Sequence, residues 1–184
     1  MRRLVLIAVA ALLLTACGEE RTQPPNFERA DDPSGTREVV LEDAGVSFTA
    51  PGNWPELGAA PPLEGGVSSK TAIVAVWRYP RTEPLPADRG ELADAQERLE
   101  ALIQERDPTF ALRDSELTEF DDALAIELTG RQTIGGRPYE VRSAHVFRDG
   151  AEVVVDAYAP PADFARVDGA VFVPLLASLT VAEP

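Results

Sequence analysis

The N-terminal region of the chain, up to Cys17, differs in composition from everything that follows. Met1 is followed by two arginines, and an apolar run then extends from Leu4 to Leu14. This run is shorter than the roughly 20 residues that a helix needs to span a bilayer core. A cationic start, a short apolar run and small residues before a cleavage point are typical of an export signal peptide. We therefore expect residues 1–16 to be removed and only the remainder to fold.

The residues at the expected cleavage point, Leu14, Thr15, Ala16 and Cys17, resemble the lipobox of bacterial lipoprotein signal peptides. The resemblance implies that Cys17 is acylated and becomes the new N-terminus, on the extracytoplasmic face of the cell membrane. Each buried CH₂ group contributes about 0.8 kcal/mol, and more than one acyl chain is needed for stable anchoring. The alternative is an uncleaved apolar helix buried in the fold, but the polar, proline-containing stretch after Cys17 offers it no apolar partner.

The remainder of the chain is predicted to consist of a tether and one domain. Residues 17–37 would form the lipidated N-terminus and a disordered tether, because this stretch is charged and interrupted by prolines. Residues 38–184 are long enough for one ordinary globular domain. Cys17 is the only cysteine, so this domain has no disulfide and must rely on its core.

The charge of the chain excludes one class of partner. Its formal net charge is −14, and removal of Arg2 and Arg3 with the signal peptide makes it −16. A nucleic-acid binder needs clustered cations to neutralise phosphates, so no nucleic-acid partner is expected. Anionic lipid headgroups would also repel such a body, which leaves acyl chains on Cys17 as the expected membrane attachment.

One amphipathic helix is predicted in the middle of the chain. Its apolar residues recur at helical spacing along one stripe: Leu92, Ala95, Leu99, Leu102 and Ile103. Asp88 and Glu91 have the spacing of a capping box at its start. Pro108 disfavours helical geometry at the preceding residue and is expected to end it.

Short strands are predicted on both sides of this helix. Before it, 39–41, 46–50, 67–69 and 72–77 read as strands, and the continuous apolar run Ala72–Trp77 is expected to be buried on both faces. After it, 110–118, 123–130, 139–148 and 151–159 are expected to form an antiparallel meander. Gly135-Gly136 and Asp149-Gly150 would close its later hairpins.

The C-terminal segment after Pro160 is amphipathic again. Gly169 and Pro174 make a single straight helix unfavourable there, so a bent or two-part helix is expected. A short strand over 179–181 would follow. The fold class predicted from this order is α+β, with a central antiparallel sheet flanked by helices.

One short stretch of the sequence resembles a known family. The stretch Val46–Trp54, a strand followed by Pro51, Gly52 and Trp54, looks like the opening of PsbP-like domains. Actinobacterial lipoproteins of the Lpq type, which share this α/β/α sandwich, are the nearest comparison. The resemblance implies the fold over roughly 38–181, and it implies no chemistry, because one fold hosts many functions.

His145 is the only histidine, and two residues before it stands Ser143 on the same predicted strand face. A zinc site needs three or four ligands, so a lone histidine makes none. Asp121, Asp122 and Glu119 are more simply a solvated turn than a calcium site. A structural histidine is the favoured interpretation; the alternative is an envelope hydrolase that uses His145 with a serine or carboxylate partner.

The aromatic residues Trp54, Trp77 and Tyr79, together with Phe48, are candidates for a ligand cleft. Aromatic side chains that border a proline-rich loop can line a pocket for an apolar or sugar ligand. They can equally pack the core and its rim, which is the commoner role of buried aromatics.

The sequence thus predicts an anchored envelope module that binds a partner and does not turn it over. No catalytic motif, metal site or cofactor site is present. The expected contacts are the membrane, through Cys17, and an envelope protein, a lipid or a glycan.

Overall fold

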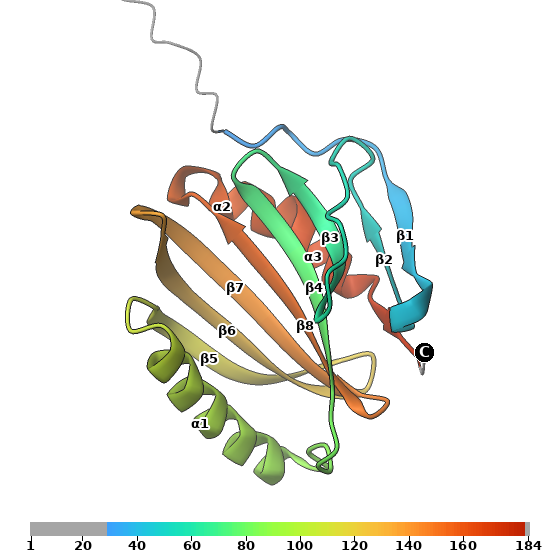
Figure 1. Ribbon diagram of the computed structural model, residues 1–184, viewed down its shortest axis with the longest axis vertical. Helices are drawn as coiled ribbons and strands as arrows, with labels where there is room; N and C mark the ends of the chain where they lie inside the picture. Colours follow the sequence, from blue (N-terminus) through green and yellow to red (C-terminus); the bar gives the residue numbers. More distant parts are fainter. Residues whose placement is uncertain (1–28, 183–184) are drawn as a thin grey trace, which may run out of the picture.

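The computed structural model describes residues 29–182 (Figure 1). The predicted signal peptide, Cys17 and most of the predicted tether lie outside these residues. The largest element is a six-stranded sheet in the order β3-β4-β8-β7-β6-β5, in which all neighbouring strands are antiparallel. Its strands are β3 (Leu63–Ser69), β4 (Ala72–Pro80), β5 (Ala111–Phe120), β6 (Ala123–Ile134), β7 (Arg137–Arg148) and β8 (Ala151–Ala159). The predicted meander is confirmed as β5-β6-β7-β8.

A second, smaller sheet brings the two ends of the domain together. It has the order β1-β2-β9, and its strands are β1 (Arg37–Leu41), β2 (Val46–Ala50) and β9 (Thr180–Val181). A 3-10 turn, Glu42–Ala44, connects β1 to β2. The expected strands 39–41 and 46–50 therefore pair with each other, but outside the central sheet.

Helices lie on both faces of the central sheet (Figure 1). One face carries α1 (Arg89–Arg106), and the other carries α2 (Pro161–Val167) and α3 (Val173–Ala177). A π-helical turn, Asp168–Phe172, joins the last two, so the predicted two-part C-terminal helix is confirmed. The predicted α+β class with a helix-flanked antiparallel sheet is confirmed as well.

The predicted capping box begins α1. Asp88 Oδ1 accepts hydrogen bonds from the backbone N–H groups of Gly90 and Glu91, at 2.8 and 3.0 Å. Glu91 Oε2 in turn accepts from the N–H of Ala87 at 2.8 Å. These contacts satisfy donors that the first helical turn leaves unpaired. Among residues 29–182, no helix is long and apolar enough to cross a membrane.

The main core lies between the central sheet, the α2–α3 pair and the small sheet. It is built from alternate residues of the strands, because side chains of a strand point to opposite faces in turn. Its fully buried members include Val74, Val76, Val153, Val155, Phe48, Trp54, Phe172 and Leu175.

The opposite face of the sheet is only partly covered. There α1 packs against β5 and β6, over a small cluster formed by Leu92, Ile126 and Leu128. The expectation that Ala72–Trp77 is buried on both faces is therefore wrong for one face. Val74 points into the main core, whereas Ile73 and Trp77 stay partly exposed, since α1 does not cover β4.

Candidate functional site

A cleft occupies the space between α1 and the uncovered part of the sheet. Its volume is about 810 Å³, within the range of small-molecule sites. The helix supplies an apolar wall with Leu99, Leu102 and Ile103, and β4, β7 and β8 supply the floor. A second hollow of about 560 Å³ shares Leu99 and Leu102 and runs on along α1, past the loop 83–86.

Strand register determines which side chains form the floor. On β8, Val154 lies opposite both Trp77 of β4 and His145 of β7, and Asp156 lies opposite Ser143. Directly opposite residues project to the same face of a sheet. All five side chains therefore line the same cleft.

The polar groups of the floor form a continuous chain. Arg81 forms an ion pair with Glu152, whose Oε1 lies 2.6 Å from Nδ1 of His145. Nε2 of His145 lies 3.1 Å from Oγ of Ser143, which also contacts Oδ1 of Asp156. Ser143 has one hydroxyl proton, so it donates to His145 or to Asp156, but not to both.

His145 is 8% exposed, and its surroundings disfavour the imidazolium ion. Burial, assisted by the positive charges of Arg106 and Arg81, lowers the pKa of His145 to about 4. A neutral imidazole donates through one nitrogen and accepts through the other. The hydrogen bond to the Glu152 carboxylate assigns the donor role to Nδ1 and leaves Nε2 as the acceptor.

Asp156 occupies the far end of this chain. Burial raises its pKa, against the opposing effect of hydrogen bonds with Ser143 and Tyr158. The hydroxyl of Tyr158 lies 3.3 Å from Asp156 Oδ2. Nε1 of Trp77 makes no hydrogen bond of normal geometry with the residues described, but it is near enough to Asp156 to favour the charged carboxylate.

The predicted aromatic cluster is divided between the two faces of the sheet. Trp77 and Tyr79 alternate along β4 and line the cleft. Trp54 does not: it is 1% exposed and lies in the main core, together with Phe48. The proline-rich loop after Trp54 contacts β3, since Glu56 pairs with Val67 and Ala60 pairs with Leu63. Two of the three predicted cleft residues are thus brought together.

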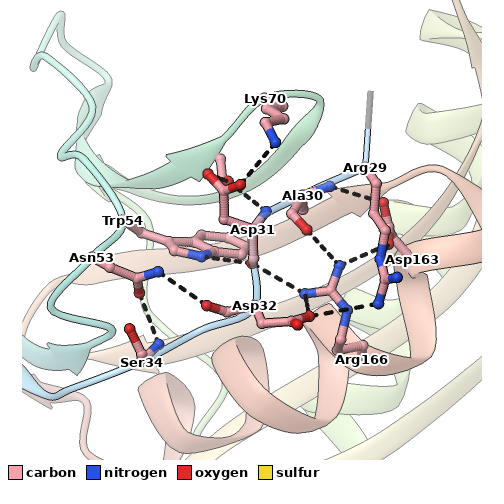
Figure 2. Close-up of polar contacts among 11 residues, drawn as sticks. Arg29, Ala30, Asp31, Asp32, Ser34, Asn53, Trp54, Lys70, Asp163 and Arg166 are labelled. Carbon is pink, nitrogen blue, oxygen red and sulfur yellow. Dashed lines mark hydrogen bonds and ion pairs between the residues drawn. The ribbon is translucent and has the colours of Figure 1, made fainter. Parts of the chain in front are cut away.

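Trp54 instead contacts the N-terminal segment of the described chain, residues 29–36, which we call the N-terminal arm (Figure 2). Its Nε1 donates to the carbonyl oxygen of Asp31 at 3.2 Å. The Asp31 N–H donates to Ser69 Oγ at 2.9 Å, and the Asp31 carboxylate pairs with Lys70 at 2.7 Å. Asn53 adds hydrogen bonds to the same arm.

A second set of contacts ties the arm to α2. The buried N–H of Ala30 donates to Asp163 Oδ2 at 3.0 Å, and Arg166 donates to the Ala30 carbonyl at 2.9 Å (Figure 2). Arg166 also pairs with Asp163 at 2.7 Å. The predicted tether ran to residue 37, whereas the chain packs on the domain from Ala30 onward. The arm lies beside α2, on the face of the sheet opposite the cleft.

Ser143 was considered beside His145 from the sequence, but three other residues of the floor were missed as site residues: Glu152, Asp156 and Tyr158. A signal for these three was present, because polar residues alternate with valine and alanine along β8. A carboxylate within such an apolar strand needs hydrogen-bond partners or a solvated cavity.

Within residues 29–182, no three His, Cys, Asp or Glu side chains are grouped to hold a metal ion. Asp121 instead pairs with Arg148.

Comparison with known proteins supports the fold. No protein-family model and no curated protein sequence matches the chain. CyanoP, the PsbP of the cyanobacterium Synechocystis, has a TM-score of 0.61 at 15% identity, covering 81% of this chain and 94% of that one. LpqN of Mycobacterium tuberculosis, described as involved in cell envelope biogenesis, has a TM-score of 0.56 at 15% identity, covering 81% and 91%.

A third solved structure is a Pseudomonas aeruginosa protein of unknown function, described as a putative regulator. It has a TM-score of 0.53 at 18% identity, and the match covers 82% of this chain and 99% of that one. Identities this low establish a shared fold and leave function open. The chain therefore has the PsbP-like fold that its sequence predicts, with an α1-walled cleft on one face of the sheet.

Proposed function

We propose that this protein is an exported, lipid-anchored module of the cell envelope that holds a small amphipathic molecule in the cleft without chemically changing it. The observation that carries the proposal is the uncovered half of the sheet face. It has an apolar helical wall, aromatic side chains and a polar floor in one cavity of about 810 Å³. That LpqN is described as involved in cell envelope biogenesis agrees with an envelope role.

The geometry around Ser143 favours binding over hydrolysis. Ser143, His145 and Glu152 are in contact, as the hydrolase alternative requires. However, β7 is an interior strand, paired along this stretch with β6 and with β8. Its backbone N–H groups are used in the sheet ladder, so they are not available as oxyanion-hole donors, which acyl transfer needs.

The cleft can be tested with a neutral, environment-sensitive naphthylamine dye and two charge variants. Leu102 is 61% exposed on the cleft wall, so Leu102→Glu should fold normally and place a charge where an apolar ligand lies. We expect it to weaken dye binding about tenfold, which corresponds to 1.4 kcal/mol.

The matched control is Val173→Glu, at a 43% exposed position of α3. It adds the same charge on the other side of the sheet and should leave dye affinity unchanged. Fluorescence titration measures both variants. Equal affinities for wild type, Leu102→Glu and Val173→Glu would mean that the dye does not occupy the cleft, and the proposal would fail.

The proposed anchor is tested separately through Cys17. We expect Cys17→Ser to retain residues 1–16 and to lack acyl groups, because the sulfur that carries the lipid is gone. Intact mass of membrane-extracted protein measures both changes. A Gly18→Ser variant keeps the cysteine and should be processed and acylated like wild type. A Cys17→Ser protein that is cut and held by washed membranes as firmly as wild type would contradict lipid anchoring.

A further inference from the structure

The two carboxyl groups on the cleft floor have different partners. Glu152 contacts the guanidinium of Arg81 and the ring of His145. Asp156 contacts only neutral groups, the hydroxyls of Ser143 and Tyr158. Among residues 29–182, no ion pair reaches Asp156. Burial without a cation raises the pKa of Asp156 and favours its neutral form, and a cationic ligand group would stabilise the charged carboxylate instead.

Aromatic rings border this carboxyl group inside the same cavity. Tyr158 lies two residues further along β8 on the same face, and Trp77 lies on β4 diagonally across from Asp156. Tyr79 follows on β4, and the Asp156 charge raises its pKa, second to burial. The faces of Trp and Tyr rings attract cations, and cages of such rings recognise ammonium groups.

The other charges near the cleft do not neutralise Asp156. Arg106, in the last turn of α1, acts on Asp156 through space and forms no ion pair within the described part of the chain. Glu105 and Asp107 flank Arg106 at the same rim. The whole chain carries a formal charge of −14, so a cation approaches more favourably than an anion.

From these contacts we infer that the ligand carries an ammonium group, seated on Asp156 beside Trp77 and Tyr158, with Tyr79 further along the same floor. Its apolar part lies along the α1 wall, over Leu99 and Leu102, in the direction of the second hollow. The ligand class is therefore a cationic amphiphile. This inference rests on the proposed function of the cleft, and it adds the charge and orientation of the occupant.

Three probes with the same ten-carbon chain test the inference: decyltrimethylammonium, decyl glucoside and decanoate. Calorimetry with monomeric probe compares their affinities for the folded protein. We expect the ammonium probe to bind about tenfold more tightly than the glucoside, and decanoate to bind most weakly. Asp156→Asn keeps the size of the side chain and should remove the preference for ammonium while leaving glucoside affinity unchanged.

Further variants separate charge from packing. Glu97→Gln removes a charge from an exposed position of α1 outside the cleft lining and should change nothing. Arg106→Gln should tighten ammonium binding, because a repelling cation is removed. Trp77→Leu should weaken it about fivefold, as expected for the loss of one cation–π contact.

The outcomes distinguish the two proposals. Binding of all three probes without preference for ammonium, or an ammonium affinity that Asp156→Asn leaves unchanged, would overturn the ammonium inference while the cleft remains a binding site. A preference for decanoate would do the same. If none of the three probes binds, the proposed function of the cleft fails together with the inference.

Discussion

A protein that begins at Arg37 is expected to be about 3 kcal/mol less stable to unfolding than one that begins at Arg29, since each lost hydrogen bond contributes about 1 kcal/mol. The shorter protein lacks the N-terminal arm. It loses the bond from the Ala30 N–H to buried Asp163, and it leaves Trp54 Nε1 without its acceptor on Asp31. Ala30 is 2% exposed, so the main core also loses a packed methyl group.

Urea denaturation of the two proteins measures the difference as a shift in midpoint at similar slope. A third protein that begins at Gly18 serves as the control and should match the one that begins at Arg29. Identical midpoints for the Arg37 and Arg29 proteins would show that the arm contributes nothing to stability. The same result would remove the reason for placing the domain boundary before residue 37.

The stability of the wild type is expected to fall by about 3 kcal/mol more than that of His145→Gln as the pH is lowered from 7 to 4. The pKa of His145 is about 4 in the folded protein, against an ordinary value of 6.5. Between these values the unfolded chain binds the proton and the folded protein does not. The contribution of His145 is therefore complete above pH 6.5 and is lost as the pH falls toward 4.

Chemical denaturation at several pH values gives both curves, and the carboxyl groups that the two proteins share largely cancel in the difference. The comparison uses slopes, so a uniform loss of stability in His145→Gln does not affect it. Parallel curves would contradict the prediction. They would mean that the carboxylate of Glu152, 2.6 Å from Nδ1, keeps the ring protonated in spite of its burial.

Local patterns in the sequence were sufficient for most of the secondary structure. The spacing of Leu92, Leu99 and Ile103 defined α1, and Asp88 began it through a cap that depends on neighbouring residues alone. The turns Gly135-Gly136 and Asp149-Gly150 set the hairpins of the meander for the same reason. Where the information lies within a few residues, the prediction was confirmed.

The role of Ala72–Trp77 depended on distant parts of the chain. An apolar run of this length favours burial on both faces. Whether a helix covers the second face depends on where α1 lies, and α1 packs against β5 and β6 instead. Trp77 therefore lines a cleft, and Trp54, which the sequence placed beside it, fills the main core. No local pattern distinguishes these two tryptophans.

The sequence alone determined the order of elements, the α+β class and the acidic character of this protein, because periodicity, turn residues and charge are properties of short segments. Only the tertiary structure decided that Ser143, His145, Glu152 and Asp156 meet on one floor and that the chain packs from Ala30 onward. Both depend on pairings across the sheet and between chain ends, where residues far apart in sequence become neighbours through register and packing.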